Sequence, residues 1–433
     1  MPAYPLSPGT AFRSTHLRWI AAVMLLACGC SANRLPLAPV QAGKASPSEA
    51  GGNGTALVEI TVNPGVDVTA LATAHHATLR NASWRCATLV PAEGQTSDAL
   101  IDELSLDPGV ESAEPVITAE TAESRQQSFS FDDGWGSATA CLLQPSAVIL
   151  GLDQAHAIAG GGGIRVAILD TGVAPSHPDL AGHIVGGWDF VDQDADPTDQ
   201  PEGIDNDSDG RTDEAYGHGT HVTGIVHLTA PDASLLIARV LDSEGRGDML
   251  DVARAIRWSV ANGANVINLS LGSLTKSDAV QVALSEAAAA GVVCVASAGN
   301  QGSDTPVEFP ASSHYVVAVG AVDGSDVAAP FTSYGDFVEL CAPGVLVRSL
   351  FPSSGYALWS GTSMSAGFVS GGFALLMPFH PDWGQKKLQD RLTSTARRIS
   401  QIGYHSGLGA GALDLGAALA PELVDSQHAH DTN

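Results

Sequence analysis

Four short apolar segments, spaced between residues 164 and 296, constrain the fold of the chain more than any other feature. They are Ile164–Leu169, Leu235–Val240, Val266–Ser270 and Val292–Ala296. Between the second and the third, apolar residues recur at helical spacing, namely Met249, Val252, Ala253, Ile256 and Val260. Strands that are apolar on both faces and alternate with amphipathic helices indicate a mostly parallel sheet covered by helices on both sides. The sequence therefore predicts a three-layer α/β fold.

The charge of the chain is strongly negative. It has 47 Asp and Glu against 20 Lys and Arg, which gives a formal net charge of −27. Binding to nucleic acid draws on clustered Lys and Arg, so this balance argues against a nucleic-acid partner. An acidic surface is compatible with bound cations, although a merely solvated surface explains most of these charges.

The first thirty residues have the pattern of an export signal. Arg13 and Arg18 precede an apolar run from Trp19 to Ala27, which is too short to span a membrane stably. The run ends at Cys28 and Cys30, in the manner of a bacterial lipoprotein box. Either cysteine is a candidate for lipidation, and an ordinary signal peptide is the alternative. We expect an exported protein, secreted or tethered to the cell envelope, and no transmembrane helix.

The composition of the chain changes several times between the signal and the apolar segments. Residues 31–54 are rich in Ala, Pro, Gly and Ser, which is typical of a tether. Residues 55–121 alternate strand-like and helix-like patterns, including a helix that Ser97 is expected to cap, and they predict a small α+β domain. Residues 122–143 carry no periodicity and are expected to be an exposed linker. A large domain over 144–420 and a loose tail over 421–433 complete the division.

Four further cysteines remain, at Cys86, Cys141, Cys294 and Cys341. Their spacing is not that of a metal site. A disulfide cannot be assigned from the spacing, so none is predicted.

Three short motifs supply an acid, a base and a nucleophile. They are Asp170 in Leu-Asp-Thr-Gly, His218 in Gly-His-Gly-Thr-His, and Ser363 in Gly-Thr-Ser-Met-Ser. Asp170 follows an apolar strand and is suited to orient an imidazole, while His218 can take a proton from a hydroxyl. His221, one helical turn further on, is more readily explained as a structural residue. The order Asp, His, Ser differs from that of chymotrypsin and of the α/β-hydrolases.

Donors for a developing oxyanion are also present. Ser363 precedes an apolar helical pattern, so it is expected at a helix N-terminus, where free backbone N–H groups favour negative charge. Asn300 ends a strand-like segment and can supply a side-chain N–H. Together these features predict nucleophilic catalysis with oxyanion stabilisation.

These motifs together resemble those of the subtilisin-like serine protease family, over roughly residues 55–420. The resemblance implies a subtilisin-like catalytic domain preceded by a ferredoxin-like propeptide, which acts as chaperone and inhibitor until it is cut off. It implies the triad Asp170, His218 and Ser363, with Asn300 as oxyanion donor. The expected activity is that of a serine endopeptidase made as a zymogen, acting on polypeptides through an acyl-enzyme. The maturation cut is expected between about Glu123 and Gln144.

The resemblance also implies how substrate binds. Ser270, Leu271 and Gly272 would pair with an extended substrate, and the segment around Gly247 would form the opposite wall. Glu308 stands two residues before Pro310, where the family's pocket for the side chain before the scissile bond has its base. A carboxylate there is expected to favour Lys or Arg. The alternative is that Glu308 faces solvent and the pocket is broad and apolar.

Acidic residues gather before His218. Residues 187–196 resemble the calcium loop of thermitase-type family members, and 205–216 match an EF-hand loop except at its last ligand position, which is Tyr216. We expect structural Ca²⁺, and none for catalysis. The candidate ligands are Asp189, Asp192, Asp194, Asp196, Asp205, Asp207, Asp209 and Asp213.

Two other functional classes compete with the protease. A non-catalytic, calcium-stabilised binding module on a protease fold would need no triad, so the complete set of catalytic residues counts against it. An esterase is less favoured still, because the sequence around Ser363 lacks the Gly-x-Ser-x-Gly elbow.

Overall fold

The structure is a computed structural model that describes residues 56–123, 130–131, 136–206, 208–400 and 407–420. The expected signal peptide with Cys28 and Cys30, the tether and the C-terminal tail lie outside these residues. Residues 124–129 and 132–135 of the expected linker do so as well.

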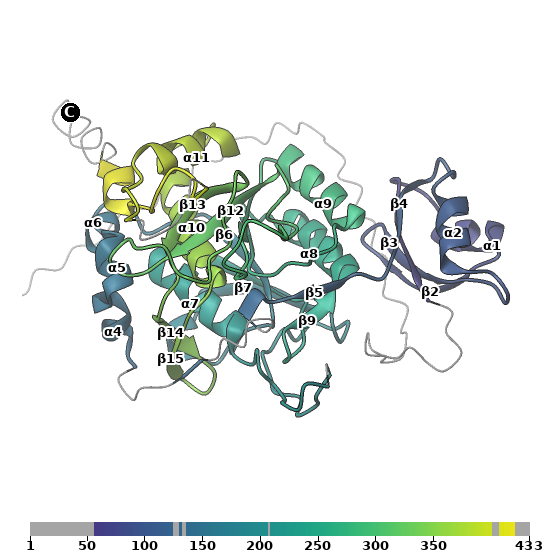
Figure 1. The fold of residues 1–433 in the computed structure, drawn as a ribbon, viewed down its shortest axis with the longest axis horizontal. Coiled ribbons are helices and arrows are strands. Elements are labelled where there is room, and N and C mark those ends of the chain that lie inside the picture. Colours follow the sequence, from purple (N-terminus) through teal and green to yellow (C-terminus); the bar gives the residue numbers. More distant parts are fainter. Residues whose placement is uncertain (1–55, 124–129, 132–135, 207, 401–406, 421–433) are drawn as a thin grey trace, which may run out of the picture. The chain divides into compact units, whose positions relative to one another are not determined.

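A parallel sheet of seven strands organises the described part of the large domain (Figure 1). Its spatial order is β13-β12-β11-β10-β6-β8-β7, and each neighbouring pair is parallel. The strands are β6 (Arg165–Asp170), β7 (Ile184–Asp189), β8 (Ser234–Arg239), β10 (Val266–Leu269), β11 (Val293–Ser297), β12 (Val316–Val322) and β13 (Val338–Pro343). All four apolar segments of the sequence lie in this sheet, so the predicted α/β architecture is confirmed.

Helices cover both faces of the sheet. On one face lie α7 (His218–Thr229) and α10 (Thr362–Leu376), and on the other α8 (Met249–Ala261) and α9 (Asp278–Ala289) (Figure 1). Side chains of a strand alternate between two separate cores, because successive residues point to opposite faces. In β6, Val166 and Ile168 join the core under α7 and α10, whereas Ala167 and Leu169 join the core under α8.

Helix α10, which carries Ser363, is buried along its whole length. The span Thr362–Phe379 is long and apolar enough to cross a membrane, but 83% of it is buried inside the protein. It is therefore a core helix of the large domain. A Cβ on Gly367 would lie 3.0 Å from Ile225 Cγ2, so this glycine permits the close contact between α10 and α7.

A small domain, residues 56–115, forms an antiparallel sheet of order β2-β3-β1-β4 with two helices. Its elements are β1 (Val58–Val62), α1 (Val68–Ala74), β2 (Thr78–Ser83), β3 (Cys86–Val90), α2 (Ser97–Leu104) and β4 (Val110–Pro115). The α+β class agrees with the sequence. Two details differ. Thr96, not Ser97, caps α2 by accepting from Ala99 N, and strand β2 was not expected because its residues alternate in exposure without a strong apolar face.

The outer face of this small sheet contacts helices α8 and α9 of the large domain. Glu114 of β4 caps α9: it accepts from Ser277 Oγ (2.6 Å) and from the backbone N of Asp278 (2.6 Å) and Ala279 (3.2 Å). Arg257 Nη1 of α8 donates to the Sγ of Cys86, at 3.0 Å. The four described cysteines are free and buried.

Shorter elements complete the described structure. They are β5 (Thr118–Glu120), α4 (Ala138–Leu143), α5 (Pro145–Ile149), α6 (Leu152–His156), η1 (Pro178–Leu180), β9 (Arg246–Asp248), β14 (Val347–Phe351), β15 (Gly355–Trp359), η2 (Met377–Phe379) and α11 (Gln385–Ser394). Helix α4 corrects the expectation of an irregular linker over 122–143, since Ser137 caps a helical turn there by accepting from Ala140 N.

Candidate active site

Asp170 and His218 meet where strand β6 ends and helix α7 begins. Asp170 Oδ1 lies 2.7 Å from His218 Nδ1 and also accepts from Thr171 N, at 2.8 Å. The helix can start this close to the strand because Gly219 has no side chain: a Cβ there would lie 2.2 Å from Gly172 O. Gly217, with φ at +90°, supplies the left-handed turn before the helix. Local glycines thus fix the contact between the acid and the base.

Both members of this pair are buried, Asp170 at 1% exposure and His218 at 0%. Burial lowers the pKa of His218, but the charge and hydrogen bond of Asp170, with a contribution from Glu123, outweigh burial and raise the pKa to about 10. The ring also packs edge-on against Trp359, with centroids 5.2 Å apart. The imidazole is therefore held in one orientation and favoured in its charged form.

Ser363 is the second residue of α10 and is fully buried. Its Oγ lies 2.8 Å from Glu123 Oε2 and 3.3 Å from the carbonyl oxygen of Ser270. The same Glu123 oxygen lies 3.4 Å from His218 Nε2. The structure thus brings Asp170, His218 and Ser363 to one site, with a carboxylate between the base and the hydroxyl.

Asn300 lies beside the start of α10. Its Oδ1 accepts from the backbone N of Thr362 at 3.0 Å and from Thr362 Oγ1 at 2.9 Å. Because these contacts fix the oxygen, the Nδ2 group is left as the donor of the side chain. The amide of Asn300 and the backbone N–H of Ser363 are thereby placed at the same helix terminus.

His221, on the next turn of α7, is engaged elsewhere. Its Nε2 lies 3.1 Å from Val347 O and 3.2 Å from Ala357 O, so it ties α7 to strands β14 and β15. Burial, and then the charge of His218, lower its pKa to about 3. A neutral ring that donates to backbone carbonyls holds structure and is not placed to exchange protons with Ser363.

The chain from Thr118 to Glu123, here called the cleft segment, runs between the two expected walls. Ala119 pairs with Gly247 in an antiparallel ladder between β5 and β9. On the other side, Glu120 N donates to Gly272 O (2.9 Å) and Gly272 N to Glu120 O (2.8 Å). Thr121 N donates to Gly245 O, at 2.9 Å. Both walls therefore bind an extended backbone by main-chain hydrogen bonds.

Glu308 lies in the wall of this cleft and is 1% exposed. A Cβ on Gly272 would lie 2.7 Å from Glu308 Oε2, and one on Gly299 would lie 2.6 Å from Oε1. The carboxylate thus sits between the two glycines, and Gln301 Nε2 donates to it. It does not face solvent.

The acidic loops differ from the expected calcium sites. Arg239, buried at the end of β8, pairs with Asp189 (2.8 Å), Asp192 (3.1 Å) and Glu202 (2.5 Å). One guanidinium thus contacts all three carboxylates, and among the described residues Asp189 and Asp192 belong to no cluster arranged to hold a metal ion. Asp194 and Asp196 are exposed in the following turn.

The second acidic loop is held by its own backbone. Asp205 accepts from the N–H groups of Asp209 and Gly210, and Asp213 accepts from those of Glu202 and Gly203. Asp207 lies outside the described residues. Among the residues described, no group of three or more His, Cys, Asp or Glu side chains is arranged to hold a metal ion.

Two residues of this site were not expected from the sequence. Glu123 contacts both His218 and Ser363, and its segment carries no pattern that would reveal it. Asp199, buried behind His218, accepts from Gly217 N at 3.2 Å and Thr220 Oγ1 at 2.9 Å. Burial raises the pKa of Asp199 to about 6. In the sequence, Asp199 is marked only by its place in the acidic stretch before His218, which does not distinguish it from the other acidic residues there.

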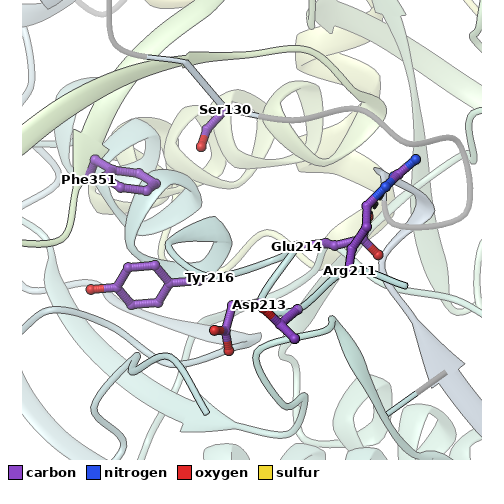
Figure 2. A pocket seen from close by; sticks show the side chains of 7 residues that line it. Ser130, Arg211, Asp213, Glu214, Tyr216 and Phe351 are labelled. Carbon is purple, nitrogen blue, oxygen red and sulfur yellow. Dashed lines mark hydrogen bonds and ion pairs between the residues drawn. The ribbon is translucent and has the colours of Figure 1, made fainter. Parts of the chain in front are cut away.

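A pocket of about 430 Å³ adjoins the start of α7 (Figure 2). Tyr216 and Phe351, whose rings meet edge-on with centroids 5.8 Å apart, line one part of it. Arg211, which pairs with Glu214 at 2.8 Å, lines another part together with Asp213. None of Asp170, His218 and Ser363 lines this pocket, so it is distinct from the site where they meet.

Comparison with known proteins places the chain in one family. Residues 161–411 match the model of the subtilase family, Peptidase_S8. Thermitase from Thermoactinomyces vulgaris is 39% identical over 262 residues, which are 58% of this chain and 88% of thermitase. Subtilisin DY from Bacillus licheniformis is 38% identical over 270 residues, covering 60% of this chain and 91% of that protein.

Solved structures agree. A protease from Pseudoalteromonas arctica PAMC 21717 superposes with a TM-score of 0.58 at 30% identity, over 63% of this chain and 94% of that one. Fervidolysin from Fervidobacterium pennivorans, described as a keratinolytic enzyme related to subtilisin, gives a TM-score of 0.68. Its identity is 24%, over 87% of this chain and 62% of that one, so it supports the fold alone.

The chain belongs to the subtilase family. It is accordingly a hydrolase, a serine endopeptidase that acts on polypeptides, and among its relatives are thermitase and the subtilisins.

Proposed function

We propose that Asp170, His218 and Ser363 form the catalytic triad of this peptidase and that Asn300 completes its oxyanion site. The observation that carries the proposal is the 2.7 Å contact between Asp170 and His218, made beside a serine at a helix N-terminus. Burial of all three side chains excludes water from the pair until substrate replaces the cleft segment.

The steps follow from this geometry. Once the cleft is open, neutral His218 takes the proton of Ser363 as its Oγ attacks the carbonyl carbon of the scissile bond. Asp170 holds the Nδ1–H tautomer and stabilises the imidazolium. The Ser363 N–H and the Asn300 amide donate to the oxyanion. His218 then gives its proton to the leaving amine, which leaves an acyl-enzyme that water hydrolyses with His218 again as base.

Labelling with a fluorophosphonate tests the assignment. After incubation that allows maturation, the wild-type protein should label, whereas Ser363→Ala should not, because only Ser363 has the base and oxyanion donors needed to react. Ser365→Ala, two residues further along α10, serves as the matched control and should label like wild type. Equal labelling of Ser363→Ala would remove Ser363 from its role.

We further propose that the small domain and the cleft segment are a propeptide that inhibits the enzyme in cis until it is cut off. The supporting observations are the Glu114 cap on α9 and the antiparallel pairing of Ala119 and Glu120 within the cleft. Ser363→Ala should therefore remain full-length. If Glu308 selects basic side chains, the cut should follow Arg125, the only Lys or Arg between Arg85 and Arg165. Sequencing the mature N-terminus decides this.

Calcium binding by the loop 205–213 remains part of the proposal. It is supported by the spacing of Asp205, Asp209 and Asp213 and by the excess of carboxylates over cations in this loop. A chelator should lower the melting temperature of the protein, and Ca²⁺ in excess should restore it. An unchanged melting temperature would refute the proposal.

The N-terminal pattern supports export, with Cys28 or Cys30 as the lipidated residue. Cell fractionation with single Cys28→Ser and Cys30→Ser variants tests this. Loss of membrane association should follow from one substitution only. Association with the membrane in neither the wild-type protein nor the variants would favour simple secretion.

A further inference from the structure

The carboxylate of Glu123 lies between the Ser363 hydroxyl and the His218 imidazole, where a proton must pass from the nucleophile to the base. It is 1% exposed, and its Oε2 lies 2.8 Å from Ser363 Oγ and 3.4 Å from His218 Nε2. Its Oε1 lies 3.4 Å from the backbone N of Ser363. One side chain thus meets the hydroxyl, the imidazole and an oxyanion donor together.

The space around this carboxylate is closely fitted. A Cβ on Gly361 would lie 1.7 Å from Glu123 Oε1, so the side chain is admitted only because residue 361 is a glycine. The cleft segment delivers Glu123 to this point, since Glu120 and Thr121 are fixed by main-chain bonds to Gly272 and Gly245. The contact therefore follows from a defined register and is not a chance contact of a surface side chain.

The charges at the site make this contact strong. His218 lies between the carboxylates of Asp170 on β6 and Glu123 on the cleft segment, with the neutral ring of His221 behind it on α7. Burial raises the pKa of Glu123, but the hydrogen bond and charge of His218, together with Ser363, outweigh burial and leave the pKa below its usual range. The site therefore holds an imidazolium between two anions.

Two elements of catalysis are disabled in this arrangement. A protonated His218 cannot accept the proton of Ser363, and the Ser363 hydroxyl donates to Glu123 instead of to the imidazole.

We propose that the side-chain carboxylate of Glu123 is an electrostatic latch that holds the triad inactive in the full-length chain, separately from the filling of the cleft by backbone. The inference rests on the proposed function, because a latch requires Ser363 to be the nucleophile. It assigns to one charged side chain a part of the inhibition that would otherwise belong to the whole propeptide.

Removal of the charge tests the latch. Full-length Glu123→Gln and Glu123→Ala should react with a fluorophosphonate about tenfold faster than full-length wild type, because a charge-assisted contact of this kind is lost. The reaction is followed on the unprocessed band during the first minutes. Glu120→Gln is the matched control, since Glu120 lies on the same strand but pairs with Arg246 at 3.3 Å. It should react like wild type.

A second measurement does not depend on processing. In the Ser363→Ala background the chain stays intact, and ¹⁵N NMR reports the protonation of His218 in the full-length protein. Glu123→Gln should lower the pKa of His218 from about 10 toward its ordinary value, while Glu120→Gln should leave it in place. An unchanged titration of His218, or equal labelling of the full-length variants, would overturn the latch. Failure of matured wild type to label would instead overturn the proposed function.

Discussion

Glu308 is the side chain whose chemistry bears most directly on substrate choice. Its carboxylate is buried between Gly272, which pairs with the cleft segment, and Gly299, which precedes Asn300. A carboxylate enclosed in this way interacts strongly with a cation that enters the same pocket, because little water screens the pair. An apolar side chain in the same pocket would gain no such attraction.

Substitution of Glu308 is therefore expected to change selectivity more than catalysis. Wild-type mature enzyme should cleave after Lys or Arg at least about tenfold better than after Phe or Leu, and Glu308→Gln should lose this preference. The value of kcat/KM for matched peptides with Lys, Phe and Leu before the scissile bond measures it, and the Phe and Leu peptides serve as internal controls. If wild-type enzyme cleaves after Phe with the same kcat/KM as after Lys, the expectation is wrong.

Some residues of the site could be predicted from the sequence because they lie in short motifs, whereas others could not. Asp170, His218, Ser363 and Asn300 could be singled out because each lies in a short motif at a strand end or a helix start. Glu123 could not, since its role depends on where a strand register places it, and no spacing in the sequence encodes that. The calcium prediction at Asp189 and Asp192 stays a prediction. Their contact with Arg239 could not be foreseen for a related reason, since Arg239 lies about fifty residues away along the chain.

Helices α7 and α10 begin at the residues proposed for catalysis and pack against each other beneath the sheet. Gly371 of α10 lets that helix approach Thr229 of α7, and Gly219 lets α7 approach Gly172 O in the turn after β6. The positions of β6, β8, β10 and β11 and of these two helices could be predicted, because apolar residues dominate these segments of the buried large domain. Strand β2 could not, because its side chains alternate between exposed and half-buried and leave no apolar signal.

Gly219→Ala should destabilise the junction of β6 and α7. The added methyl would lie 2.2 Å from a backbone oxygen that cannot move aside without shifting the strand end, and overpacking of this kind costs about 1–3 kcal/mol. Thermal unfolding in the Ser363→Ala background measures the change. Gly162→Ala is the control, because its nearest neighbour is Asp232 Cβ at 3.8 Å. Equal melting temperatures for both variants would contradict the argument.

The small and large domains meet across a buried acidic cluster. Glu59 of β1 is 1% exposed, and both of its carboxylate oxygens lack an N–H or O–H donor. Burial, then the charge and proximity of Asp248, with a smaller effect of Asp251, raise the pKa of Glu59 well above its usual value, and Arg254 offsets this only in part. Two facing carboxylates can share one proton, so this contact is most stable when Glu59 is protonated.

The sign of the pH dependence follows. A group whose pKa is raised in the folded state contributes stability that is complete below its ordinary pKa, about 4.5, and is lost as pH rises through the folded value. The melting temperature of full-length Ser363→Ala should therefore fall as pH rises from acid to neutral. Glu59→Gln, which mimics the protonated form, should flatten this fall. Glu93→Gln, at an exposed position of the small domain, should not. Parallel profiles for all three proteins would refute the role of Glu59.

The ladders on both sides of the cleft segment have a consequence for the proteins that this peptidase can attack. Gly272, Gly245 and Gly247 bind the cleft segment through main-chain hydrogen bonds. A substrate must offer the same backbone N–H and C=O groups, and these are already hydrogen-bonded where the target protein is helix or sheet. The rate at which a target protein is cleaved should consequently depend on how easily a segment of it unfolds locally and becomes extended. Denatured or loosely folded proteins should therefore be cleaved fastest, and compact proteins should resist cleavage even when they carry favourable side chains.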